Sequence, residues 1–197
     1  MLHTISSLRA ATDQQHQRLH HHPALAPLTE TTVRKAQYLS ALSSFYGFYK
    51  PLEEKFCRCD DPLFAEFEKG DNVERLSHDL AHHGVDTAQL RLLPLDDTPF
   101  TREQALGYLY LREGSALGGQ LISKKLSDNL ALVPGRDNTF FFGKGKLSAA
   151  EWKKYIDKLQ EIDAAGLVDS AAAAAFAGTL FSALETWLTQ ENNANDR

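Results

Sequence analysis

Cysteine, clustered positive charge and long apolar runs are all scarce in this 197-residue chain. The two cysteines, Cys57 and Cys59, are separated by one residue, a spacing that seldom forms a structural disulfide, so we expect free thiols in a reducing cytoplasm. No apolar run approaches the roughly 20 residues of a membrane helix. Residues 1–19 also lack the apolar segment of a secretory signal. These absences predict a cytoplasmic protein that does not interact with a membrane.

Charge of one sign is not concentrated anywhere in the chain. The formal net charge is −5, from 21 basic and 26 acidic residues, and the basic residues form no block. A nucleic-acid groove is therefore not expected. Hydrophobic residues make up 43% of the chain, as in ordinary soluble proteins, and its length suits one domain with a substantial core.

Sequence signatures of several enzyme classes are missing as well. No glutamate begins the Glu-x-x-His motif of a carboxylate di-iron bundle, and there is neither a Walker phosphate loop nor a Gly-x-Ser-x-Gly nucleophile elbow. His78 and His82 are four residues apart on an expected helix, and residues 20–22 are all histidine. Without a third ligand at a suitable spacing, adventitious surface binding of metal is the preferred interpretation of these histidines.

Helical periodicity is what the sequence does contain. No segment shows sustained period-two alternation, and apolar residues at helical spacing fill most of the chain, which predicts an all-α fold. We expect loops over residues 85–100 and 130–146 and a polar tail over residues 192–197. The expected helices cover about residues 4–20, 31–56 (capped by Thr31 or Thr32), 71–84, 101–126, 148–162 and 169–187.

Three features qualify these expected helices. Pro51 is expected to kink or divide the second helix, because proline lacks an amide hydrogen and clashes with the preceding turn. Thr101 with Gln104, and Ser148 with Glu151, have the spacing of capping boxes, which predicts helix starts at both places.

The helix after Thr101 contains three glycines that a stable helix would avoid. Each costs roughly 1 kcal/mol relative to alanine. At about 100° per residue, Gly107, Gly114 and Gly118 lie within about 40° of one another, on the same face as Leu121. Two interpretations remain open: the glycines permit a close helix–helix crossing, or a flat ligand lies against the bare backbone.

His16 is the most informative histidine. It shares a stripe of the first helix with Ile5, Leu8, Thr12 and Leu19. A histidine on a core-facing stripe is often a hydrogen-bonded structural residue, but neutral imidazole is also the common protein ligand of heme iron. Arg9 lies on nearly the same stripe about 10 Å away, a distance at which a cation would reach a porphyrin propionate.

Taken together, these stretches resemble the heme oxygenase family, particularly its bacterial biliverdin-producing members, over nearly the whole chain. The resemblance rests on motifs in the family's order: Leu8-Arg9-x-Ala11-Thr12-x-x-x-His16, Phe45-Tyr46-x-x-Tyr49-x-x-Leu52-Glu53-Glu54, and Glu113-Gly114-Ser115-x-Leu117-Gly118-Gly119-Gln120. In the C-terminal third it rests on residues 140–142, Trp152, Lys153 and Phe176.

The resemblance implies a single-domain multi-helix bundle over residues 1–191 that oxidises heme to biliverdin, CO and ferrous iron. It implies O2 and an external electron donor of the ferredoxin or flavin reductase type as partners, with heme as both substrate and cofactor. His16 would ligate the iron, Arg9 and Lys153 would meet the propionates, and Phe176 would pack near the heme. Gly114, Ser115 and Gly118 would form the catalytic distal side.

Three positions depart from the family's pattern. His20 stands where members often carry an acidic residue, Ser115 where the mammalian branch has aspartate, and Asp157 where a basic residue is expected. These departures motivate an alternative, a non-enzymatic heme-binding or heme-delivery protein that keeps the fold. A third hypothesis is a helical interaction module in which the glycines pack against another helix.

Overall fold

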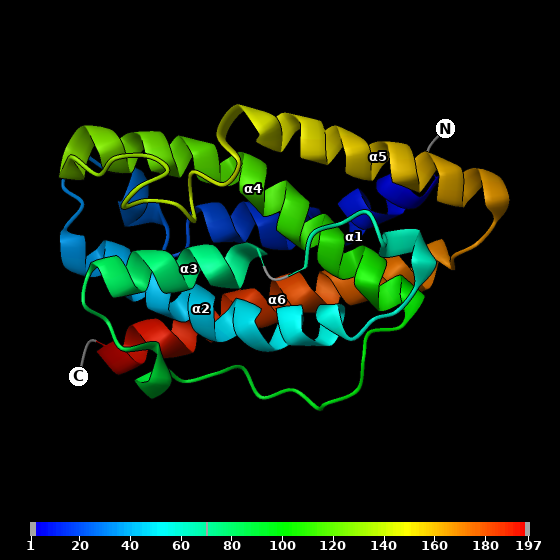
Figure 1. The fold of residues 1–197 in the computed structure, drawn as a ribbon, viewed down its shortest axis with the longest axis horizontal. Helices are drawn as coiled ribbons and strands as arrows, with labels where there is room; N and C mark the ends of the chain where they lie inside the picture. Colours follow the sequence, from blue (N-terminus) through cyan, green and yellow to red (C-terminus); the bar gives the residue numbers. More distant parts are fainter. Residues whose placement is uncertain (1–2, 70, 196–197) are drawn as a thin grey trace.

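The computed structural model describes residues 3–69 and 71–195, which form α-helices joined by loops and short 3-10 helices (Figure 1). Within those residues the β pairing is limited to an isolated bridge between Pro134 and Asn138. The all-α prediction is confirmed. The elements are α1 (His3–His20), η1 (Ala26–Thr29), α2 (Lys35–Cys57), η2 (Pro62–Phe64), α3 (Asp71–His82), η3 (Thr87–Gln89), α4 (Arg102–Leu130), η4 (Gly145–Leu147), α5 (Ser148–Ala165) and α6 (Ser170–Asn195).

Side-chain capping explains where two of these helices begin. The predicted capping box of α4 is confirmed: the Thr101 hydroxyl accepts from the Gln104 amide at 3.3 Å, and the Gln104 side chain accepts from the Thr101 amide at 3.0 Å. The predicted cap of α2 at Thr31 or Thr32 is wrong. That helix begins at Lys35, because the Gln37 side chain accepts from the Arg34 amide at 2.9 Å.

The starts and ends of other helices differ from the sequence expectations. Ser148 is the first residue of α5, and within the described part of the chain its buried hydroxyl has no hydrogen-bond partner, so the predicted capping box with Glu151 is wrong. The α4 helix runs four residues past the expected end, to Leu130. The α6 helix continues to Asn195, so residues 192–195 extend this helix rather than form a separate tail, and residues 196–197 lie outside the described residues.

Pro51 lies inside α2 without dividing it, so the predicted division is wrong. Proline cannot donate to the carbonyl four residues earlier, which belongs to Gly47. The amide of Leu93, in the loop that crosses α2, donates to that carbonyl at 2.9 Å instead. Gly47 also allows the loop to approach, since a Cβ there would collide with the Arg91 carbonyl oxygen. The loop therefore satisfies the group that the proline leaves unpaired.

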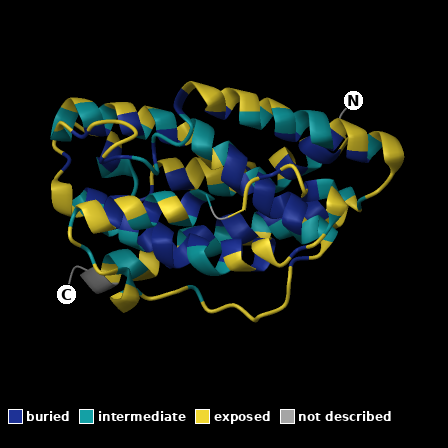
Figure 2. Cartoon of the chain, viewed as in Figure 1, coloured by how far each residue is buried: buried dark blue, intermediate teal, exposed yellow. Residues whose placement is uncertain are grey.

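The α6 helix packs against α1, α2 and α4, and buried residues concentrate where these helices meet (Figures 1 and 2). Residues 170–193 are long and apolar enough to cross a membrane, by length and composition. The expectation that no apolar run approaches the length of a membrane helix is therefore wrong. Nearly half of the most apolar part of this helix is buried inside the bundle. Its position in the core accounts for its apolar composition.

Helices α1 and α6 run parallel. Three polar contacts along α6 join residues 167 positions apart: Gln15 with Ser182 at 3.3 Å, Arg18 with Glu185 at 2.7 and 2.8 Å, and His22, just after α1, with Thr189 at 3.0 Å. Near the start of both helices, the Thr4 and Ser170 hydroxyls, 166 positions apart, lie 2.6 Å from each other. Gly178 brings the two backbones together, because a Cβ there would lie 3.0 Å from the Ala11 carbonyl oxygen. The α1 helix, which carries His16, is thereby held in register with α6.

His22, just after α1, is buried as a neutral imidazole. Its Nδ1 accepts from the Ala24 amide at 3.2 Å. The Thr189 hydroxyl donates to the Glu185 carbonyl at 2.9 Å, so it accepts from His22 Nε2 at 3.0 Å. Burial lowers the pKa of His22, although the Glu185 carboxylate opposes this change. Protonation would place an N–H against the Ala24 amide and break the contact.

The free energy of unfolding is therefore expected to decrease as the pH falls through about 6.5, the pKa of an unfolded histidine. Below that pH, His22 binds a proton in the unfolded chain but not in the folded one. The stabilisation by neutral His22 is therefore complete above about pH 6.5 and is lost as the pH falls toward the lower pKa of the folded state. His22→Gln should reduce the pH slope by up to about 1.4 kcal/mol per pH unit. Urea unfolding between pH 5 and 8 measures this slope. The exposed neighbour supplies a control, His21→Gln, and equal slopes in both variants would contradict the assignment.

Candidate functional site

Two of the glycines of α4 make room for other parts of the chain. A Cβ on Gly107 would lie 3.0 Å from the Ala173 carbonyl oxygen and 3.1 Å from the Ala177 amide, both on α6. A Cβ on Gly119 would lie 2.9 Å from the Phe141 carbonyl oxygen, in the loop over residues 131–147. The helix-crossing interpretation therefore holds for Gly107, and Gly119 has a comparable role in packing the loop.

Gly114 and Gly118 have different surroundings. Apart from the neighbouring backbone of α4, no heavy atom of the described residues would lie within 4 Å of a Cβ on Gly118, and one on Gly114 would meet Trp152 alone, at an ordinary 3.6 Å. Leu121, expected on the same face, is 59% exposed. Packing inside the chain thus explains neither glycine. The bare backbone at Gly114 and Gly118 is a surface against which a flat ligand can lie.

Three aromatic side chains connect this surface to α1. We call Tyr110, Trp152 and Phe181 the aromatic cluster. Its ring centroids are 5.9 Å apart for Tyr110 and Trp152, and 6.2 Å apart for Tyr110 and Phe181. Trp152 borders Gly114, and Phe181 lies 6.3 Å from the ring of His16. His16 and Gly114, on different helices, therefore border the same cluster.

His16 is exposed, whereas the other members of its predicted stripe are buried: Ile5, Leu8, Thr12 and Leu19. The expectation that His16 shares the buried face is therefore wrong, because the stripe opens to solvent at this turn. Partial burial and the neighbouring His20 lower the pKa of His16, and Asp13 opposes them. This favours the neutral imidazole, the form that binds a metal.

Ser115 lies on α4 next to Gly114 and contacts α2. Its hydroxyl donates to the Arg112 carbonyl at 2.9 Å, so at 3.0 Å from the Tyr49 hydroxyl it is the acceptor. Burial raises the pKa of Tyr49 to about 12 despite the hydrogen bond to Ser115. Tyr49 therefore remains a neutral donor at physiological pH.

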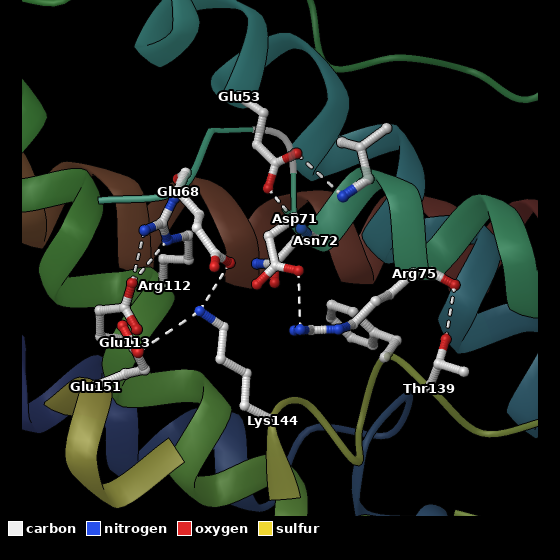
Figure 3. A network of polar contacts seen from close by, with 12 residues as sticks. Glu53, Glu68, Asp71, Asn72, Arg75, Arg112, Glu113, Thr139, Lys144 and Glu151 are labelled. Atoms are coloured by element: carbon white, nitrogen blue, oxygen red, sulfur yellow. Dashed lines mark hydrogen bonds and ion pairs between the residues drawn. The ribbon is translucent and has the colours of Figure 1, made fainter. Parts of the chain in front are cut away.

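A buried polar network supports α4 around Arg112 (Figure 3). The Arg112 guanidinium donates to Glu113 at 2.9 and 2.7 Å and to the Glu68 carbonyl at 2.7 Å. The Glu53 carboxylate of α2 accepts from the amides of Asn72 and Val73 at 2.9 and 3.0 Å, which caps the start of α3. These contacts join α2 to α3, and α4 to the loop that precedes α3.

Lys144 extends this network to α5. Its ammonium group lies 2.7 Å from Glu68 and 3.7 Å from Glu151, the charged groups drawn around it in Figure 3. A cavity of ≈ 20 Å³ lies beside it, with room for about one water molecule. Ser148, whose hydroxyl has no hydrogen-bond partner among the described residues, is one of the residues that line the cavity. A larger cavity of ≈ 270 Å³ lies farther along α4, and none of the predicted site residues lines it.

The remaining predicted site residues are Arg9, Lys153 and Phe176. Arg9 is exposed on α1. Lys153 is an exposed residue of α5 whose ammonium group pairs with Asp157 at 2.5 Å. Phe176 packs against Phe100, with ring centroids 5.5 Å apart, and against Gly107.

Sequence reasoning missed Phe181, the aromatic neighbour of His16. In the sequence, Phe181 can be recognised only as one more apolar position on the last helix. Its meeting with His16 depends on the parallel register of α1 and α6. Within the described part of the chain, no three His, Cys, Asp or Glu side chains are grouped to hold a metal ion.

Fold and site together define an all-α bundle with a candidate surface for a planar ligand, bordered by an imidazole and a bare helix backbone. The sequence model of the family described as heme oxygenase matches residues 3–189, so the chain belongs to the heme oxygenase family. The structure of heme oxygenase from Leptospira interrogans has the same fold, with a TM-score of 0.71 and 18% sequence identity. The match covers 95% of this chain and 98% of that one. No curated protein is significantly similar in sequence.

Proposed function

We propose that this protein is a heme oxygenase that opens heme to biliverdin, CO and ferrous iron, using O2 and electrons from a separate donor. Membership of the family over residues 3–189 is the observation that carries the proposal. The position of His16 and Gly114 at the border of one aromatic cluster supports it. When bound, heme supplies the iron that activates O2 and the meso carbon at which the ring opens.

His16 and the backbone at Gly118 are the groups that would hold heme. His16 is exposed and favours its neutral form, so a nitrogen lone pair is available to the iron. The unfilled space at Gly118 suits a planar ring system, which a side chain at that position would displace. Arg9 is the proposed partner of one propionate, and Lys153, once released from Asp157, of the other. Phe176, through Phe100 and Gly107, would support the aromatic side of the pocket.

Ser115 would orient water on the distal side. The Ser115 hydroxyl already donates its hydrogen to the Arg112 carbonyl and accepts one from Tyr49. Toward a water molecule it can therefore act only as an acceptor, through its remaining lone pair. A water molecule held there would direct its second hydrogen elsewhere in the pocket. Tyr49 and the Arg112 carbonyl would keep the serine in place, so that the water it holds has a fixed orientation.

Incubating the purified protein with hemin, a reductant and air tests the proposal. The Soret band should decrease as the spectrum of biliverdin appears, with CO released into the headspace. An unchanged heme spectrum would argue against the activity.

We propose a ferredoxin or flavin reductase type of electron donor and a cytoplasmic location. Each purified donor can replace the chemical reductant in the same assay.

A non-enzymatic heme-binding or heme-delivery protein is the second candidate. The pairing of Lys153 with Asp157, which withdraws one proposed propionate contact, favours it. This candidate predicts stoichiometric hemin binding, a spectrum that depends on His16, and no ring opening under reductant and air.

The His16→Ala variant is expected to bind hemin more than about tenfold more weakly and to lose most turnover. Changes in residues around a metal ligand alone cost about 10–100-fold, so loss of the ligand itself should cost more. Because His16 is exposed, the apoprotein should keep its stability within about 0.5 kcal/mol. Hemin titration followed at the Soret band measures the affinity. His78→Ala is the matched control, a solvent-facing histidine on α3. Wild-type binding and spectra in His16→Ala would refute the ligand assignment.

A further inference from the structure

The cavity of ≈ 270 Å³ lies on the side of α4 opposite the candidate ligand surface. At about 100° per residue, Ser127, which lines the cavity, lies about 180° around the helix from Gly118. The cavity is therefore separate from the surface proposed for heme. Its volume is about that of nine water molecules in the liquid, which is enough for a small organic molecule.

The loop over residues 131–147 folds back along α4 and forms the second wall of the cavity (Figure 1). Side chains of α4 hold it there. Gln120 donates to the Gly145 carbonyl at 2.7 Å, and the Ser123 hydroxyl accepts from the Asn138 side chain at 3.0 Å. Gln120 and Ser123 both line the cavity. The wall is thus preformed, so a ligand does not have to order the loop when it binds.

Phe142 gives this wall an aromatic surface. Its ring packs on two glycines of the loop: a Cβ on Gly135 would lie 3.2 Å from the ring, and a Cβ on Gly145 would lie 2.6 Å from it. The glycines therefore allow the ring to lie where it does. Because Phe142 is only half-buried, part of the ring remains open to a ligand, and a second planar ring is a favourable partner for it.

The charged groups that line the cavity do not cancel. Two lysines and one aspartate give a net charge of +1. Lys124 is paired with Asp128 at 3.1 Å, whereas Lys146 is exposed and forms no ion pair with a described residue. The buried Ser123 hydroxyl accepts from Asn138, so its own hydrogen remains available to a ligand. This balance favours a ligand with a single negative charge.

We infer that the cavity binds a small aromatic monocarboxylate, with its carboxylate at the Lys146 ammonium group and its ring against Phe142. Inorganic phosphate would leave the aromatic surface unused. A neutral aromatic molecule would gain nothing from the charge of Lys146. The site lies on the far side of α4 from Gly118, so the inference does not depend on heme binding.

Titration of the isotope-labelled apoprotein with sodium benzoate, followed by NMR, tests the inference. Benzoate should shift the amide signals of Ser123, Ser127 and Gly145 with a Kd of about 1 mM or lower. Benzyl alcohol and inorganic phosphate should each bind about three- to tenfold more weakly, because each lacks one of the two contacts.

Variants separate the charge from the cavity. Lys146→Gln should weaken benzoate binding about three- to tenfold and leave benzyl alcohol binding unchanged. Ser127→Leu should fill the cavity and weaken both. Lys125→Gln is the matched control, since this lysine of α4 does not line the cavity, and it should bind benzoate like the wild type. Circular dichroism verifies that each variant folds.

The opposite results would overturn the inference. These are unshifted amide signals at millimolar benzoate, or equal affinity for benzoate and phosphate, which would mean an adventitious ion only. Equal weakening by Lys125→Gln and Lys146→Gln would show attraction to surface charge without a site. Shifts confined to Gly114 and Gly118 would place benzoate on the surface proposed for heme. Because these titrations contain no hemin, a negative result in the hemin assay leaves their outcome unaffected.

Discussion

Substituting Gly118 with leucine is expected to weaken hemin binding by about 10–100-fold while leaving the apoprotein as stable as the wild type or more stable. Outside the neighbouring backbone of α4, no described atom would lie within 4 Å of a Cβ at this position, so the apoprotein has open space where the side chain begins. Replacing a helical glycine gains roughly 0.5–1 kcal/mol. A leucine in the space proposed for heme overpacks the complex by about 1–3 kcal/mol, which corresponds to the expected loss of affinity.

The neighbouring glycine provides the matched control. A Cβ on Gly119 would approach the Phe141 carbonyl oxygen to 2.9 Å, and a backbone atom cannot move aside as a flexible side chain does. Gly119→Ala should therefore reduce the free energy of unfolding by about 1–3 kcal/mol. Urea unfolding and hemin titration of both variants separate the two roles. Gly118→Leu would contradict the proposed ligand surface if it bound hemin like the wild type or unfolded as easily as Gly119→Ala.

The second large effect is expected at Asp79. Its carboxylate is fully buried and accepts from the Thr139 amide at 2.9 and 2.8 Å, from the Thr139 hydroxyl at 2.7 Å and from the Phe140 amide at 2.9 Å. Asp79→Asn keeps the shape but turns an amide NH2 toward these donors. Hydrogen bonds to charged groups contribute about 1.5–3 kcal/mol each, so we expect a loss of about 2–4 kcal/mol.

The expected consequence extends to the candidate site. Asp79 holds the start of the residue 140–142 run, and Phe141 packs against Gly119 on α4. Urea unfolding of the apoprotein measures the loss of stability. Asp128→Asn is the control, because this exposed residue pairs with exposed Lys124 at 3.1 Å and should change stability by less than about 0.5 kcal/mol. Similar losses in the two variants would show that Asp79 does not anchor the loop.

Local chemistry explains the predictions that were confirmed. The capping box of Thr101 and Gln104 involves groups three residues apart, so the start of α4 can be read directly from the sequence. The buried members of the α1 stripe follow from helical periodicity in the same way. The cap of α2 was missed because Gln37 reaches back to Arg34, a residue type that is not itself a usual cap.

By itself, the sequence determined the all-α fold, the family and the two helices that carry the candidate site, because periodicity, capping and motif spacing are properties of neighbouring residues. Only the tertiary structure decided which glycines are covered. Gly107 and Gly119 contact the backbone of distant segments, whereas no atom of another described segment fills the space beside Gly118. It also placed Phe181 beside His16, through the parallel register of α1 and α6. These facts depend on contacts between residues far apart in the chain, and helical spacing within one segment does not encode them.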